Sequence, residues 1–147
     1  MSAQTKFLFD LDFGARAGLD ATARRLEVEV VEVAVAVARK LAPELIAREP
    51  FAEIAALVRE CFTHLVAAPH VVVRVNDALH AQARERLDEI ARGRGFEGRL
   101  VVLGETEIAP GDCRIEWADG GVIRDRSAVA SAIDDLVSRY IAARRTA

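Results

Sequence analysis

The sequence predicts an α+β fold, in which long N-terminal helices precede a small α/β domain of order β-α-β-β-β-α that ends in a hairpin and a helix. Two observations lead to this class. In the first half, apolar residues recur at spacings of three and four over a long stretch without a turn signal. The second half alternates short apolar runs with glycine-containing turns.

Composition narrows the class of protein further. The chain has 147 residues, 52% of them hydrophobic but only 5% aromatic, and a net charge of -3. The hydrophobic content is sufficient for the core of one domain. The slightly negative net charge gives the chain no general attraction for nucleic acid. No apolar run has the ~20 residues that a membrane span needs, and no secretory signal opens the sequence. Two distant cysteines predict reduced thiols, so we expect a cytoplasmic protein without a membrane span or a nucleic-acid partner.

Residues 1–14 form the first segment. Phe7, Phe9 and Phe13 alternate with other side chains, and the run stops at Gly14. One interpretation is a short strand or arm that packs on its own domain. The other is a linear anchor that docks on a partner by strand addition or in a groove. The residues alone leave both open.

Residues 15–68 are expected to be a helical region. The run "LEVEVVEVAVAVA" alternates like a strand, but Asp20 offers a helix cap and the length without a turn favours one long helix. Pro43 marks either a kink or the next turn. Such a helix must cover its apolar stripe with the rest of the chain or with a second copy. The seam predicted for a second copy comprises Leu26, Val30, Val33, Ala34, Val37, Ala38 and Leu41.

A second helix is predicted from about Phe51 to Ala67, and residues 69–147 form the α/β domain. Strands are expected at 70–75 and 99–104, separated by a helix that Gly93 and Gly95 end. Asp119-Gly120-Gly121 predicts a hairpin after "CRIEW". Ser127 is expected to cap the last helix. Its predicted buried stripe consists of Val129, Ile133, Leu136, Val137 and Tyr140.

Candidate catalytic and metal-binding groups are weak. Strand alternation places Cys113 beside Ile115 and Trp117 on an apolar face, where a thiol is inert. Cys61 is expected in the core, so that a zinc site with the three histidines, His64, His70 and His80, is disfavoured. The glycine-rich stretch 93–98 follows a helix and precedes a strand, which is the reverse of the order in phosphate loops. We therefore expect no catalytic residue, metal or cofactor.

The C-terminal half resembles the FliH/SctL family of type III secretion ATPase regulators over roughly residues 70–141. The resemblance rests mainly on one motif, "LxPGxCxIExxxGxIDxxxxxxLxxI". Its most characteristic positions are Pro110, Gly111, Cys113, Ile115, Glu116, Gly121 and Asp125. The E subunit of V/A-type rotary ATPases is a related stalk protein.

The resemblance implies a non-enzymatic flagellar assembly protein. It would form a homodimer through its N-terminal helices, and its domain at 69–147 would bind and restrain the type III export ATPase at that enzyme's N-terminal domain. It would act as a stator at the cytoplasmic base of the flagellar export apparatus. Phe7, Phe9 and Phe13 would contact the export gate or a C-ring component.

Three alternatives accompany this interpretation. Two stay within the scaffold class: a peripheral-stalk subunit of a V/A-type ATPase and an injectisome stator of the SctL type. The third is a thiol-dependent enzyme that uses Cys113. The short small-residue repeat at Ala34, Ala38 and Ala42, and Phe in place of the commoner Trp in the anchor, depart from the flagellar pattern.

Overall fold

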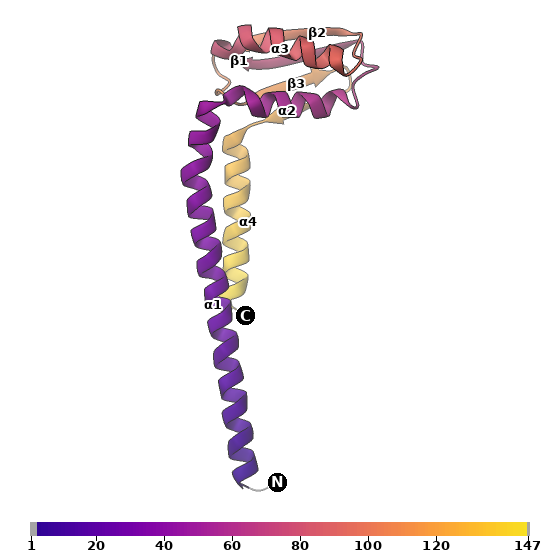
Figure 1. Cartoon of the computed structure of the whole chain (residues 1–147). Helices are drawn as coiled ribbons and strands as arrows, with labels where there is room; N and C mark the ends of the chain where they lie inside the picture. The colour runs from indigo at the N-terminus through magenta and orange to yellow at the C-terminus, as the bar shows by residue number, and fades with distance from the viewer. Residues whose placement is uncertain (1–2, 147) are drawn as a thin grey trace. The chain divides into compact units, whose positions relative to one another are not determined.

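The structure, a computed structural model, describes residues 3–146 and has the predicted α+β class. Its elements follow the predicted order (Figure 1). They are α1 (Ala3–Arg48), α2 (Pro50–Phe62), β1 (His70–Asn76), a 3-10 turn (Asp77–Leu79), α3 (His80–Gly93), β2 (Arg99–Glu105), β3 (Cys113–Trp117), β4 (Gly120–Arg124) and α4 (Arg126–Thr146). Two compact units result: one joins residues up to Lys40 with those from Ser131 onward, and the other is Leu41–Ala130.

The Leu41–Ala130 unit contains a four-stranded sheet of order β2-β1-β3-β4. β1 and β2 are parallel and are joined through α3, whereas β3 pairs antiparallel with both β1 and β4. The hairpin between β3 and β4 is confirmed, with Ala118 and Asp119 between the strands. Asn76 caps the 3-10 turn by accepting from the backbone N–H of Ala78, which lies 2.9 Å away. Gly95, at φ 78°, follows the end of α3 as predicted.

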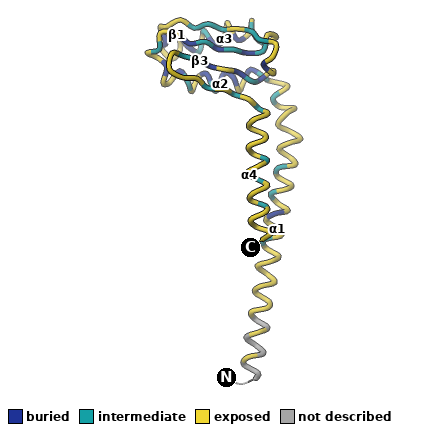
Figure 2. Tube along the Cα trace, turned by 180° about the vertical axis from the view of Figure 1, so that it is seen from behind, coloured by how far each residue is buried: buried dark blue, intermediate teal, exposed yellow. Residues whose placement is uncertain are grey.

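One face of the sheet carries the core of this unit. Val71, Val73 and Val75 alternate inward along β1 and are fully buried, as are Cys113 and Ile115 on β3. Helices α2 and α3 cover this face (Figures 1 and 2). Their apolar residues complete the cluster: Phe51, Ile54, Ala55, Val58 and Phe62 from α2, and Ala83, Leu87 and Ala91 from α3.

The boundary between the two compact units differs from the predicted domain boundary, because α2 packs on the sheet. Residues 15–68 were expected to form one helical region before an α/β domain at 69–147. In the structure α2 contributes to the core of the sheet, so it belongs with the α/β unit, while most of α4 belongs with α1. The physical reason is that α2 has an apolar face that must be buried, and the sheet beside α3 buries it. This face consists of Phe51, Ile54, Val58 and Phe62.

Helix α1 is longer than expected. Helical structure begins at Ala3 and continues through Gly14 and Gly18, so the interpretation of the first segment as a strand is wrong. No strand among the described residues pairs with this segment, and a lone strand cannot satisfy its backbone groups as a helix does. Pro43 lies inside α1, which continues to Arg48.

The expected burial of α4 is also wrong in part. Val129, Ile133, Leu136 and Tyr140 are 40–59% exposed, and only Val137 of the predicted stripe is half-buried. The helix packs through the adjacent positions Asp134, Val137 and Ile141, which places the larger apolar side chains beside the contact rather than in it. Ser127 lies within the helix, and Asp125 makes the cap by accepting from the N–H of Ala128 at 3.0 Å.

Candidate interaction surfaces

The predicted dimer seam forms an open stripe on α1. We call Leu26, Val30, Val33, Val37 and Leu41 the outer stripe; their side chains are 50–66% exposed. The first four follow spacings of four, three and four, which is the a/d pattern of a coiled coil. Ala34 and Ala38, also exposed, flank this stripe. Among the residues that the structure describes, none buries the outer stripe (Figure 2).

A second apolar stripe lies on the opposite side of α1. Val28 is buried and Val31 and Val35 are half-buried, because they face α4. At about 100° per residue, the nine positions from Val28 to Val37 correspond to half a turn beyond two full turns. The stripe that meets α4 and the outer stripe are therefore on different sides, and α4 leaves the outer stripe open.

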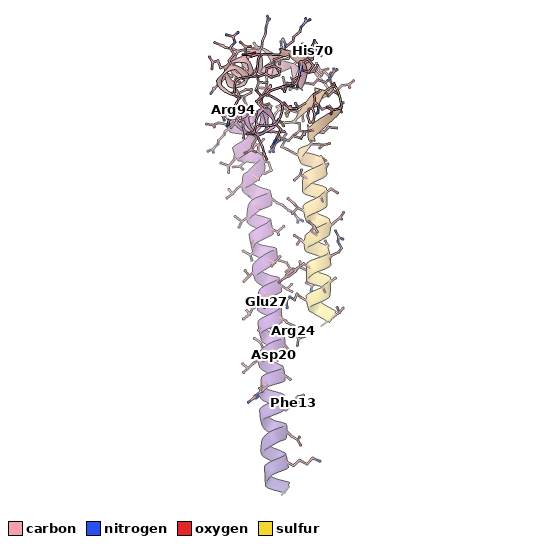
Figure 3. All side chains as sticks on the ribbon, turned by 90° about the vertical axis from the view of Figure 1, so that its right-hand side faces the viewer. Phe13, Asp20, Arg24, Glu27, His70 and Arg94 are labelled. Atoms are coloured by element: carbon pink, nitrogen blue, oxygen red, sulfur yellow. The ribbon has the colours of Figure 1, made fainter. Side chains whose placement is uncertain are left out.

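Ion pairs reinforce the contact between α1 and α4. Arg39 pairs with Asp134, Glu27 lies 3.2 Å from Arg144, and Glu32 lies 3.0 Å from Arg145. All three pairs are substantially exposed, so each adds little stability in salt. Their main effect is on the register of α4 along α1, because they contribute little to the free energy of the contact. Figure 3 labels Glu27, together with Phe13, Asp20 and Arg24, which precede it on α1.

The predicted anchor residues lie on the first turns of α1. Phe13 is 69% exposed and projects from the helix (Figure 3). The side chains of Phe7 and Phe9 lie outside the described part of the structure. The anchor remains a prediction for all three, although an exposed phenylalanine at position 13 has the form it requires.

The family motif surrounds the turn before β3 and the start of α4. The Asp112 carboxylate accepts from both the backbone N–H and the Nε–H of Arg126, each at 3.2 Å. Arg126 also donates to the carbonyl of Pro110 at 2.9 Å. Gly111 adopts φ +94°, a conformation that side chains with a Cβ rarely adopt. The Pro-Gly-Asp turn thus holds the first turn of α4, which gives these motif residues a structural role.

The rest of the motif lies in the hairpin. Cys113 and Ile115 point into the core, while Glu116 lies on the other face, 2.9 Å from Arg74 of β1. Arg74 also pairs with Glu105 of β2, so one guanidinium joins three strands. Gly121 is opposite Glu116 in the β3–β4 register, where an added Cβ would meet the Ile115 carbonyl at 3.0 Å. Ile123 is 67% exposed on β4.

Cys113 has none of the features of a nucleophile. It is 1% exposed, and burial raises the pKa of its thiol to about 11. A nucleophilic cysteine instead needs a lowered pKa and a base in contact. Burial also raises the pKa of Cys61. The described residues contain no group of three or more His, Cys, Asp or Glu side chains that could hold a metal ion.

The three histidines are scattered in the structure. His64 follows α2, His70 starts β1, and His80 starts α3 with its Nε2 3.0 Å from the carbonyl oxygen of Val102. Sequence reasoning overlooked two surfaces instead: the exposed apolar residues of α4, and a groove between α2 and α3 that contains arginines. The exposed surface of α4 could have been found from its 4-3-4 spacing of apolar residues, which also fits a core. The residues with this spacing are Val129, Ile133, Leu136 and Tyr140.

Within residues 3–146, no helix combines the length and the apolar character that crossing a membrane requires. No curated protein matches the chain. A family model described as flagellar assembly protein FliH matches residues 15–123, from α1 through most of β4.

Proposed function

The chain belongs to the FliH family of flagellar assembly proteins, and from this premise we propose that it is a non-enzymatic stator of the type III export ATPase. It dimerises through α1, binds the N-terminal domain of the ATPase through the α/β unit, and lowers the rate of ATP hydrolysis. Its N-terminal segment tethers the complex to the export gate or a C-ring component. Its place is the cytoplasmic base of the flagellar export apparatus.

The outer stripe of α1 is the observation that carries this proposal. Five large apolar side chains, the first four of them in a coiled-coil a/d pattern, are half or more exposed in the isolated chain. Contiguous exposed apolar surface of this kind marks a protein–protein contact. A second copy of the same helix satisfies the pattern without a change in the α1–α4 contact, since that contact uses the other side of α1.

The α/β unit supports a binding role rather than catalysis. The Cys113 thiol of this unit is buried with a raised pKa, and the family motif connects a turn, a hairpin and the start of α4. Such a domain offers a rigid surface to a partner. We assign it the contact with the ATPase, and α1 the dimer contact.

Measurements with the export ATPase from the same cell test the proposal. The purified chain should bind that enzyme in a pull-down and lower its rate of ATP hydrolysis in a saturable way. An ATPase that neither binds the chain nor changes its rate contradicts the assignment. Removal of residues 1–13 should leave this binding intact and abolish localisation to the flagellar base in cells. Loss of ATPase binding on that truncation would show that the segment belongs to the binding surface.

A further inference from the structure

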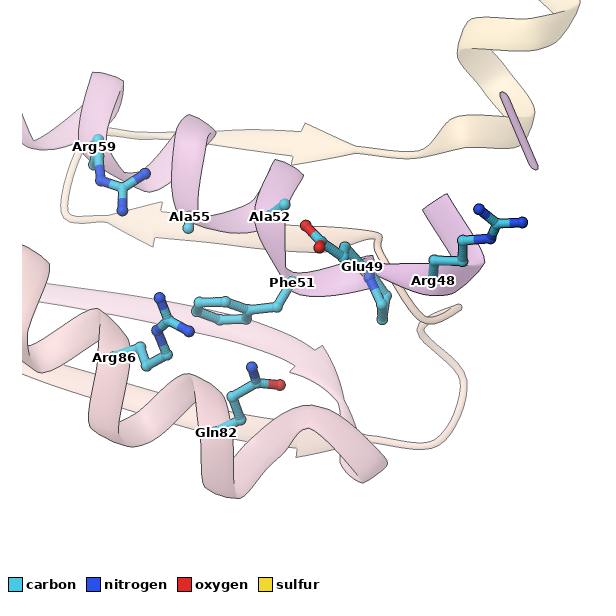
Figure 4. Close-up of a pocket in the computed structure, with 9 residues that line it drawn as sticks. Arg48, Glu49, Phe51, Ala52, Ala55, Arg59, Gln82 and Arg86 are labelled. Atoms are coloured by element: carbon cyan, nitrogen blue, oxygen red, sulfur yellow. The ribbon is translucent and has the colours of Figure 1, made fainter. Parts of the chain in front are cut away.

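A groove between α2 and α3 contains arginines without acidic partners. The groove has a volume of about 470 Å³, with Phe51 and Ala55 among the residues that line it (Figure 4). Arg59 of α2 and Arg86 of α3 point into the space between the two helices, and Gln82 adds an amide. Both arginines are exposed, which leaves their N–H groups open to a ligand.

Neither guanidinium is neutralised by the chain. Among residues 3–146, no carboxylate lies within ion-pair distance of Arg59 or Arg86. In contrast, many other arginines of the chain are paired, and the chain as a whole is acidic at -3. Two like charges directed into one groove repel each other unless an anion lies between them. The groove is therefore complementary to negative charge.

The ring of Phe51, which lines the groove, positions one of these arginines. The Arg86 guanidinium lies over the Phe51 ring, with Cζ 5.7 Å from the ring centroid. This cation–π contact places the guanidinium against the ring. Because the contact uses no N–H···O hydrogen bond, the N–H donors of Arg86 stay available to a carboxylate. Phe51 is itself 5% exposed and fixed in the core, so Arg86 is held by a rigid support.

We propose that the α2–α3 groove binds an acidic segment of a protein partner, with one or two carboxylates between Arg59 and Arg86 and the Gln82 amide as a further donor. A nucleic acid requires a longer basic track than two arginines in an acidic chain provide. The opposite end of the groove, at Arg48 and Glu49, has mixed charge and favours a polar residue there. The inference concerns the groove and does not depend on which protein supplies the segment.

The test uses the full chain and a capped, fluorescently labelled hexaglutamate peptide, with hexaglutamine as the neutral control. Binding is followed by fluorescence anisotropy at low ionic strength, and the site is mapped by the NMR signals of backbone amides and arginine Nε–H groups. We expect saturable binding of hexaglutamate alone, with shifts at Arg59, Gln82 and Arg86. Physiological salt should weaken the binding.

Two double variants separate a site from general charge. Arg59→Glu with Arg86→Glu should weaken hexaglutamate binding by at least about tenfold. Arg94→Glu with Arg114→Glu makes the same charge change at exposed arginines outside the groove and should leave the affinity within about twofold. Equal weakening by both variants, absence of saturable binding, or shifts spread over the surface would overturn the proposal. If inorganic phosphate or ATP produces the groove shifts and hexaglutamate does not, the site binds phosphate and the proposal is wrong. Thermal melts check that the variants fold. If a variant does not fold, the NMR mapping of hexaglutamate on the unmodified chain decides whether the peptide binds in the groove.

Discussion

Replacement of Val30 and Val37 by glutamate should convert the proposed dimer to a monomer. Their side chains are 66% and 51% exposed in the isolated chain, and both lie in the centre of the outer stripe. Full burial of a valine is worth about 1.5–2 kcal/mol, so covering these exposed fractions in a dimer contributes about 2 kcal/mol per copy. A symmetric dimer counts each change twice, which gives about 4 kcal/mol, or roughly a thousandfold in the dissociation constant.

The charge of the new side chains acts in the same direction. Two glutamates per copy would face their counterparts across the seam, and like charges at such short range repel one another. Glutamate is a better helix former than valine, so α1 itself should persist. Circular dichroism should therefore report unchanged helix content while the mass falls to that of a monomer.

The assay is light scattering coupled to size-exclusion chromatography at tens of micromolar protein. Ile123→Glu is the matched control: Ile123 is 67% exposed, close to the 66% of Val30, but it lies on β4 outside the stripe. The unmodified chain and this control should both run as dimers. A monomeric unmodified chain, or a double variant that dimerises as well as the parent, would refute the reasoning from the outer stripe.

Two further predictions concern the fold. Gly98→Ala should lower the free energy of unfolding by about 1–3 kcal/mol, because its Cβ would lie 2.8 Å from the Pro69 carbonyl oxygen and 2.7 Å from the Phe96 ring; Gly14→Ala, in open space on α1, should instead leave stability equal or higher in the same urea titration. The pKa of Cys113 is raised from 9.0 to about 11, so the unfolded chain loses this proton first and stability should fall as pH rises from about 9 towards 11, by about 1 kcal/mol at pH 10. Cys113→Ala should flatten that fall, and an unchanged slope would remove the thiol as its cause.

Local patterns were sufficient to predict the α/β unit. Buried valines of β1, the glycine stop after α3 and the alternation of "CRIEW" each depend on neighbours in sequence, and each is confirmed. What could not be predicted depends on distant partners. Val129 and Ile133 have a core-like spacing, but burial requires a surface to pack on, and α4 meets α1 through Val137 and Ile141 instead. The charges that face one another between α2 and α3 are invisible in sequence for the same reason.

The strand-like run in α1 has a physical explanation that also bears on function. Valines at 28, 31 and 35 face α4, and valines at 30, 33 and 37 form the outer stripe on the opposite side. Two opposed stripes on one helix bring apolar residues close to every second position, which is the pattern of a strand. A surface helix with one buried side shows a single stripe. The alternation that obscured the helix therefore follows from two apolar sides, of which α4 covers one and the described residues leave the other exposed.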